Sequence, residues 1–288
     1  MKISAMFSAG KPVVSFEIFP PKPDLPLETV FATLEELRGL KPAFISVTYG
    51  AGGSSSSRSI EIVDKVKNLY GVETVAHMTC VGATRQTIDA VLDRLQALNI
   101  ENILALRGDQ PTGEDAALRP DSRFCYARDL IAHARRRNFF SIAAAAYPEG
   151  HFECRDIDQD IEYLAEKVEQ GVDLLITQLF FDNSYFYNFR NKLAGRGISC
   201  PVSAGIMPVL NAAQIKRITS LCGAAVPDEL ARIMAQYGGF PAEMEKAGID
   251  YACRQMRDLL DNGVDGIHLY TMNKARQTKT IMDNLGLI

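Results

Sequence analysis

No stretch of the 288-residue sequence approaches the roughly 20 apolar residues that a membrane-spanning helix requires. The amino-terminal segment 1–14 holds two lysines and lacks the apolar run of a signal peptide. An excess of basic residues is also missing, because 31 basic residues face 35 acidic ones and leave a net charge of −4. We therefore expect a cytoplasmic protein whose partners include neither membranes nor nucleic acids.

Signatures of metal sites and of nucleotide-binding loops are missing as well. The six cysteines form no C-x-x-C pair and no cluster with histidine, so we expect reduced, mostly buried thiols and no metal site. No G-x-G-x-x-G fingerprint of a dinucleotide-binding fold occurs in the chain. Segment 51–57, AGGSSSS, lacks the lysine of a phosphate-binding loop, and we expect a flexible loop over the site there.

Short apolar runs dominate what the sequence does contain, and each is followed by a helical pattern. Several runs are apolar almost throughout, as in parallel strands that helices cover on the outside. The eight runs span residues 13–19, 44–49, 74–79, 102–106, 140–145, 174–181, 202–206 and 266–270.

The segments between the runs carry helical signals at both ends. Thr84 and Asp156 stand where N-caps are expected, and Gly171 is placed to end a helix in the left-handed conformation. Similar turns lead from a helix into the next run at 71–73, 171–173 and 263–265, each with the pattern Gly-Val-acid. Such alternation of strand and helix indicates βαβ units and a parallel sheet.

Eight such units predict an α/β protein with the (β/α)8 TIM-barrel fold, since closure of the sheet leaves no exposed edge. An open, doubly wound sheet is the alternative. No linker or shift of composition divides the chain, so we expect one catalytic barrel domain over residues 1–288. Residues 212–262 are expected to form extra helices between the last two strands.

Polar residues gather at the expected carboxyl ends of the strands, where barrel enzymes place their chemistry. Glu17 is the most informative of them, because Phe16 and Ile18 flank it in the first run. A carboxylate in apolar company is costly to ionise, so we expect a raised pKa and a role as a general acid. The alternative is a structural carboxylate that pairs with a lysine or arginine of the barrel.

Local strings along the whole chain resemble those of the methylenetetrahydrofolate reductase family. One such string would be weak support, but seven in the family's order are specific. They are SFEIFPP at 15–21, SVTYGA at 46–51, LRGD at 106–109, AAYPEGH at 145–151, TQLFFD at 177–182, GIMPV at 205–209 and YTMN at 270–273.

The resemblance implies a barrel that binds FAD without a covalent bond and accepts hydride from NADH or NADPH. The reduced flavin would pass hydride to 5,10-methylenetetrahydrofolate, which gives 5-methyltetrahydrofolate for methionine biosynthesis by a ping-pong mechanism. Glu17 matches the family's proton donor to N10, and Asp109 matches a residue that contacts the pterin and influences the flavin. The expected catalytic residues are therefore Glu17 and Asp109.

The resemblance also assigns residues to the two binding sites. Asp109, Gln178, Gln214 and Lys274 match positions that contact folate, and Gln178 would also touch the nicotinamide. The positions that match FAD contacts are Thr48, Tyr49, Ala51, His77, Arg107, Gly108, Asp109, Ala127, Tyr147, His151, Asp160 and Lys167. Among these, we expect His77, Arg107 and Lys167 to converge on the cofactor.

Three positions depart from the family's pattern. Lys274 replaces an arginine of many relatives, so a point charge stands where a planar fork would bind the folate tail. Tyr163 and Glu166 stand where some bacterial members have asparagine and arginine facing the FAD. An acid at position 166 puts the binding of the FAD phosphates in doubt.

Two other functions remain open at this stage, and so do the assembly and the regulation of the protein. One alternative is a flavin-free barrel that binds a pterin for methyl transfer, and the other is a subunit of a larger reductase complex. Relatives suggest a homo-oligomer, while the sequence does not distinguish NADH from NADPH. The chain ends at Ile288 without the regulatory domain of eukaryotic members, so inhibition by S-adenosylmethionine is not expected.

Overall fold

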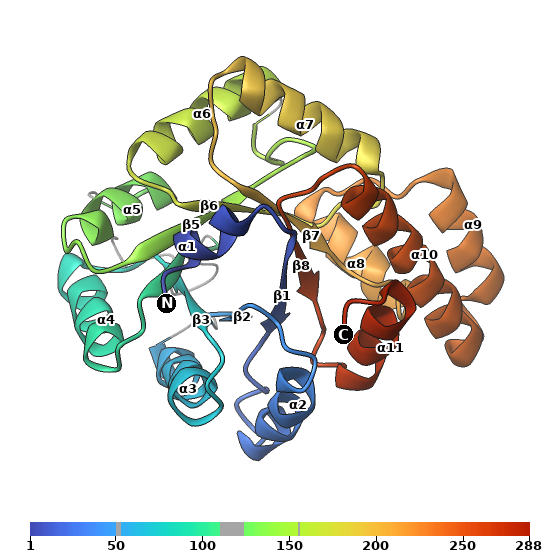
Figure 1. Cartoon of the computed structure of the whole chain (residues 1–288), viewed down its shortest axis with the longest axis horizontal. Coiled ribbons are helices and arrows are strands. Elements are labelled where there is room, and N and C mark those ends of the chain that lie inside the picture. Colours follow the sequence, from blue (N-terminus) through green and yellow to red (C-terminus); the bar gives the residue numbers. More distant parts are fainter. Residues whose placement is uncertain (50–52, 110–123, 155) are drawn as a thin grey trace.

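Eight parallel strands form a closed barrel in the computed structural model of the chain (Figure 1). The structure describes residues 1–49, 53–109, 124–154 and 156–288. Each strand pairs with the next, and β8 closes the barrel against β1. The strands are β1 (Val13–Ile18), β2 (Ile45–Val47), β3 (Thr74–Thr79), β4 (Asn102–Leu106), β5 (Ser141–Ala146), β6 (Leu174–Thr177), β7 (Val202–Ile206) and β8 (Gly266–Tyr270). The predicted TIM barrel is confirmed, and the open sheet is excluded.

Helices surround the barrel in the order that the sequence predicts. Thr84 caps α4 by accepting from the Thr87 N–H, and Asp156 caps α6 by accepting from the Asp158 N–H. The helices are α1 (Ile3–Met6), α2 (Glu28–Arg38), α3 (Gly53–Asp64), α4 (Arg85–Ala97), α5 (Ala127–Arg135), α6 (Ile157–Glu169), α7 (Asn183–Gly195), α8 (Ala212–Cys222), α9 (Asp228–Tyr237), α10 (Pro241–Asp261) and α11 (Ala275–Leu285), with a 3-10 turn at Phe7–Ala9 and a π-helical turn at Lys65–Leu69. Helices α8, α9 and α10 are the extra helices expected between β7 and β8.

Two local expectations need correction. Residues 53–57 form the first turns of α3, so the serine run is helical and the predicted flexible loop is wrong for these residues. The sixth apolar run is also longer than its strand, because β6 ends at Thr177 while Phe180 and Phe181 remain buried beyond it. Apolar character alone does not show where the pairing of a strand ends, since residues of the following loop pack into the same core.

The Gly-Val-acid turns have a structural purpose that accounts for their repetition. Their glycines, Gly71, Gly171 and Gly263, all have positive φ, at 69°, 107° and 68°. Asp173 and Asp265 then accept hydrogen bonds from backbone N–H groups at the starts of β5 and β7, at 2.7 and 2.9 Å. Each of these two carboxylates therefore ties its own strand to the preceding one at the amino-terminal end of the barrel.

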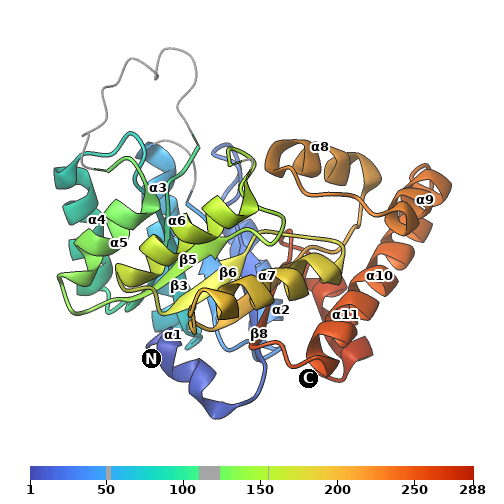
Figure 2. The same ribbon diagram turned by 90° about the horizontal axis from the view of Figure 1, so that it is seen from above.

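The barrel interior is apolar at one end and polar at the other. Phe44, Leu104 and Leu174 fill the amino-terminal end together with Ile3 of α1, and all four are buried. Figure 2 shows α1 on the same side as both chain termini, with α8 at the opposite end of the barrel. Barrel enzymes place their chemistry at the carboxyl ends of the strands, which is the end opposite this apolar cluster.

Candidate active site

Glu17 projects into the polar end of the barrel from β1. Its neighbours Phe16 and Ile18 point to the other face of the strand and lie in the core that also contains Val30 and Leu34 of α2. Side chains alternate across a strand, so residues adjacent in sequence face different surroundings. The apolar company that the sequence suggests for Glu17 therefore lies on the outer face of the sheet.

The Glu17 carboxylate meets two imidazoles and a hydroxyl inside the barrel. Its Oε2 lies 3.3 Å from His77 Nε2 and 3.4 Å from His268 Nε2. The Ser46 hydroxyl donates to the same oxygen at 3.3 Å. The side chain is 16% exposed, and Oε1 has no hydrogen bond or ion pair among the described residues.

The expected rise in the pKa of Glu17 is wrong. Burial by itself raises this pKa, but the charge of His77 and hydrogen bonds from His268 and His77 outweigh it and lower the pKa to about 2. The structural alternative was correct in kind, because the carboxylate is paired, although its partners are histidines and not a lysine or arginine. Glu17 therefore needs a proton supplied by its neighbours before it serves as an acid.

His268, on β8, is completely buried and belongs to the same cluster of polar side chains as Glu17. Its Nδ1 lies 2.7 Å from Ser15 Oγ, and its Nε2 lies 3.1 Å from Ser46 Oγ. The ring also stacks on Phe44, with centroids 5.8 Å apart and an interplanar angle of 23°. Sequence reasoning missed this residue, although its position two residues before Tyr270 places both side chains on the same face of the strand.

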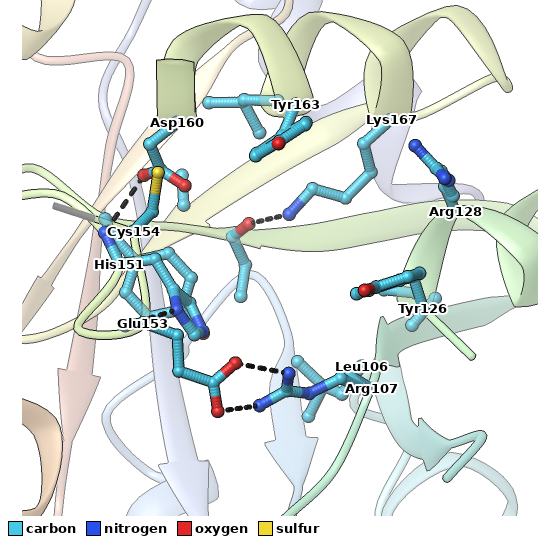
Figure 3. A pocket seen from close by; sticks show the side chains of 16 residues that line it. Leu106, Arg107, Tyr126, Arg128, His151, Glu153, Cys154, Asp160, Tyr163 and Lys167 are labelled. Atoms are coloured by element: carbon cyan, nitrogen blue, oxygen red, sulfur yellow. Dashed lines mark hydrogen bonds and ion pairs between the residues drawn. The ribbon is translucent and has the colours of Figure 1, made fainter. Parts of the chain in front are cut away.

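A cavity of about 460 Å³ opens between the ends of β4 and β5 and the helices α5 and α6 (Figure 3). Its volume falls in the range of roughly 300–1,000 Å³ that is usual for small-molecule sites. Six of the residues expected to bind FAD line it, namely Arg107, Ala127, Tyr147, His151, Asp160 and Lys167. Tyr126, Arg128, Glu153 and Cys154 line it too.

Lys167 brings a positive charge to this cavity, and no carboxylate of the described residues pairs with it directly. Its Nζ donates to the Ala145 carbonyl at 2.6 Å, which is its only hydrogen bond or ion pair among the described residues (Figure 3). Burial lowers the pKa of Lys167 to about 8, against the opposing charge of Asp160. The Asp160 carboxylate is itself engaged, because it accepts from the His151 N–H at 3.1 Å. An ammonium in this position is suited to receive an anion.

Arg107 lies on the opposite wall of the cavity and is already paired. Its guanidinium donates to both carboxylate oxygens of Glu153, at 2.6 and 2.8 Å (Figure 3). The neighbouring Tyr147 contacts the His151 ring edge-on at a centroid distance of 4.6 Å. Burial raises the pKa of Tyr147 to about 12, so this hydroxyl is a neutral hydrogen-bond donor near pH 7.

The cavity fits the phosphate-bearing half of FAD by the chemistry of its walls. Lys167 offers an ammonium without an anion, and Arg107 and Arg128 offer planar guanidiniums that suit phosphate oxygens. Tyr126 and Tyr163 add aromatic surface to the lining. A buried cation together with convergent donors is the arrangement expected of a site for a nucleotide anion.

The remaining predicted site residues that the structure describes lie outside this lining. His77 contacts Glu17 and does not line the cavity with Arg107 and Lys167. Thr48 and Tyr49 follow β2, Gly108 and Asp109 follow β4, and Gln178 follows β6. Gln214 is exposed on α8, Lys274 is exposed at the start of α11, and Ala51 lies outside the described residues. The assignment of these residues to FAD or folate stays a prediction.

The structure explains why position 108 is occupied by a glycine, which the sequence did not reveal. Its φ is +88°, and an added Cβ would meet Thr79 Cβ and Val81 Cγ1 at 3.0 Å. Both the backbone conformation and the close packing on the loop after β3 therefore require glycine. This glycine sets the direction in which the chain leaves β4 between Arg107 and Asp109.

Neither a metal centre nor a membrane segment is found in the part of the chain that the structure describes. No group of three or more histidine, cysteine, aspartate or glutamate side chains is arranged to hold a metal ion there. Within the same residues, no helix has the length and apolar character needed to cross a membrane.

Comparisons with known proteins identify similar sequences over almost the whole chain. A family model described as methylenetetrahydrofolate reductase matches residues 2–286. "Methylenetetrahydrofolate reductase (NADH) 1" of Arabidopsis thaliana is 35% identical and aligns with 100% of this chain and 50% of its own length. The chain thus spans about half the length of this plant relative. "5,10-methylenetetrahydrofolate reductase" of Pectobacterium carotovorum subsp. carotovorum is 32% identical, with 96% of this chain and 91% of that protein covered.

A solved structure with a similar fold is titled "Uncharacterized protein from Clostridium thermocellum binds two copies of 5-methyl-5,6,7,8-tetrahydrofolic acid". Its TM-score is 0.62 at 13% sequence identity, and the match covers 96% of this chain and 94% of the other. At this identity the likeness shows the fold alone.

Proposed function

The chain belongs to the methylenetetrahydrofolate reductase family, and on that premise we propose that it reduces 5,10-methylenetetrahydrofolate to 5-methyltetrahydrofolate with FAD as cofactor. The observation that carries the proposal is that two features occur in one barrel. One is the Glu17 carboxylate with its histidine partners, and the other is a cavity of nucleotide size with basic side chains in its walls. NADH or NADPH supplies the electrons, and the name of the plant relative supports NADH.

Bound FAD would accept hydride from the nicotinamide and pass it to the folate, and the protein would supply position and electrostatics. Lys167 and Arg107 would hold the phosphates in the cavity, and His77, which contacts Glu17, would contact the flavin. Glu17 would stand on the side of the folate that must gain a proton at N10. Asp109 and Gln178, on the loops after β4 and β6, would contact the pterin.

A proton shared with His268 would make Glu17 competent as the acid. Ser15 Oγ touches both the Ile267 carbonyl, at 3.3 Å, and His268 Nδ1, at 2.7 Å. Both contacts form together only if the hydroxyl donates to the carbonyl and accepts from Nδ1–H. Nε2 then faces the Glu17 carboxylate, so a proton bound to Nε2 points at Oε2.

This arrangement answers the difficulty that the low pKa of Glu17 poses. The carboxylate has a pKa of about 2, and His268 Nε2, which lies 3.4 Å from Oε2, would be the source of the proton that it needs. Proton donation from Glu17 to N10 would therefore be followed by redistribution within the pair. His268 is completely buried and would act as a positioning residue and proton store.

Anaerobic titration of the purified protein tests the proposed function. The protein should carry a flavin whose visible absorbance band bleaches on addition of NADH or NADPH and returns on addition of 5,10-methylenetetrahydrofolate. One 5-methyltetrahydrofolate should form for each flavin reoxidised. A colourless protein that binds folate would favour the pterin-binding alternative, and a flavin that neither nicotinamide bleaches would favour a subunit fed by a partner.

A further inference from the structure

Arg128 and Glu166 form an ion pair at the rim of the cavity. Arg128 lies in the first turn of α5 and lines the cavity, whereas Glu166 lies on α6 outside the lining. The Arg128 guanidinium donates to Glu166 Oε2. It also lies over the Tyr126 ring, 5.3 Å from the centroid. The guanidinium is thus held at the entrance by one carboxylate and one aromatic face.

Lys167 follows Glu166 on α6, and Figure 3 shows Arg128 and Lys167 on the same side of the cavity. Arg107 completes a set of three cations from β4, α5 and α6. Both arginines are capped by glutamates with exposed side chains, since Glu153 is 43% and Glu166 is 50% exposed. Lys167 is the one cation of the three that no described carboxylate caps.

We propose that Arg128 binds the diphosphate of FAD and that Glu166 is a displaceable carboxylate that holds Arg128 in place until the diphosphate arrives. This inference rests on the proposed use of FAD. From the sequence alone, an acid at position 166 is unfavourable for phosphate binding. In the structure, the charge of Glu166 is paired with Arg128 of the neighbouring helix. The repulsion expected between an acid and a phosphate is thereby offset.

Charge and exposure explain why the exchange is favourable. A diphosphate carries more charge than a carboxylate and offers oxygens to Arg128 and Lys167 together, whereas Glu166 serves only one of them. An exposed ion pair contributes little, because water and salt screen it, so breaking it costs little. The released glutamate returns to solvent, where it is already half exposed. Arg128 stays at the cavity, where its guanidinium lies over the Tyr126 ring.

Binding of FAD and of riboflavin to flavin-stripped protein tests the inference, because riboflavin has the same ring system without the diphosphate. We expect Arg128→Ala to weaken FAD binding by roughly tenfold, in the range of a lost hydrogen bond to a charged group. Riboflavin binding should stay the same. Glu166→Gln removes the competing carboxylate and should tighten FAD binding by about two- to fivefold, in the range of an exposed ion pair.

Glu162→Gln is the matched control. Glu162 lies on the same helix and pairs with Arg196 at 2.8 Å, with both side chains about half exposed and neither in the lining of the cavity. Its loss should leave FAD binding unchanged. In the double variant Arg128→Ala/Glu166→Gln, the gain from Glu166→Gln should disappear, because the two residues act on one contact. Arg128→Gln provides a second removal of the charge with more of the side chain retained.

Each negative result would contradict a different part of the proposal. If Arg128→Ala and Arg128→Gln bind FAD as tightly as the unchanged protein, or weaken riboflavin equally, Arg128 shapes the cavity and does not bind phosphate. If Glu166→Gln gains no affinity, or gains it without Arg128, the displacement is refuted while FAD binding itself stands. Failure of the unchanged protein to bind FAD would overturn the proposed function and this inference together.

Discussion

FAD binding should weaken above pH 8 because of Lys167. The pKa of this lysine is lowered to about 8 by burial, so the ammonium loses its proton well below its usual pH. A bound diphosphate next to Nζ stabilises the charged form and raises the pKa again. The complex therefore holds a proton that the free protein has lost above pH 8, and binding must take up that proton as the pH rises.

The magnitude follows from the fraction of free protein that carries the charge. With a pKa of about 8, Lys167 is about 90% protonated at pH 7 and about 9% protonated at pH 9, so the dissociation constant should rise about tenfold between them. Three other ionisable groups of the cavity, Tyr147, Arg107 and His151, change little over this interval. Tyr147 has a pKa of about 12, the pKa of Arg107 is raised by Glu153, and the pKa of His151 is lowered by burial.

Fluorescence titration of flavin-stripped protein with FAD at pH 7, 8 and 9 measures this effect. Riboflavin is titrated in parallel, since any ionisation of the ring system alters both ligands. Lys167→Met keeps the length of the side chain without its charge and should bind FAD at pH 7 no more tightly than the unchanged protein does at pH 9. Cys154 also lines the cavity and carries a titratable thiol, so this variant identifies the responsible group.

A flat affinity between pH 7 and 9 would refute the reasoning, because it would mean that Lys167 either keeps its proton or lies away from the phosphates. A tenfold change that persists in Lys167→Met would assign the dependence to another group. The proposed site would then lose its uncapped cation, and with it the reason to place the diphosphate in this cavity.

Three further expectations concern the reaction and the fold. Glu17→Gln should leave flavin reduction by NADH largely intact and slow folate reduction by roughly 10²–10⁴, the usual worth of a positioned acid; stopped-flow absorbance separates the two steps, and equal losses in both would mean that Glu17 only shapes the site. If Gln178 serves nicotinamide and pterin in turn, double-reciprocal plots should be parallel, and intersecting lines would count against the shared site. Gly248→Ala on α10 places a Cβ 1.9 Å from the Val209 carbonyl oxygen. It should lower the free energy of unfolding in denaturant by about 3 kcal/mol, since an overpacked backbone contact must shift. Gly239→Ala, whose added Cβ has nothing within 4 Å, is the control, and equal unfolding midpoints for the two variants would contradict the packing argument.

The order of strands and helices was predictable because its signals are local. Both ends of β3, β4, β7 and β8 coincide with the apolar runs at 74–79, 102–106, 202–206 and 266–270. The caps at Thr84 and Asp156 were correct because a side chain that accepts from the N–H two or three residues ahead needs no tertiary partner. Eight repeats and the preference for a sheet without edges then sufficed for the barrel.

The pKa of Glu17 was not predictable, because it depends on strand register. Pairing of β1 with β2 places Ser46 opposite Glu17, and pairing with β8 places Tyr270 there and His268 two residues below. Neighbours along the chain, Phe16 and Ile18, point away from the carboxylate. Only the closed barrel decides that a histidine 251 residues distant faces it.

The features of the cavity likewise separate into those that the sequence predicts and those that depend on the tertiary structure. The sequence by itself indicated that Arg107 and Tyr147 follow the ends of their strands, because strand ends are local features, whereas Lys167 was assigned through the family resemblance. The ion pairs of Arg107 with Glu153 and of Arg128 with Glu166 join residues 46 and 38 positions apart, and only the packing of β4, α5 and α6 creates them. Tertiary structure thus decides which charges are paired and which remain for a ligand, because the energy of a charge depends on the groups around it in space.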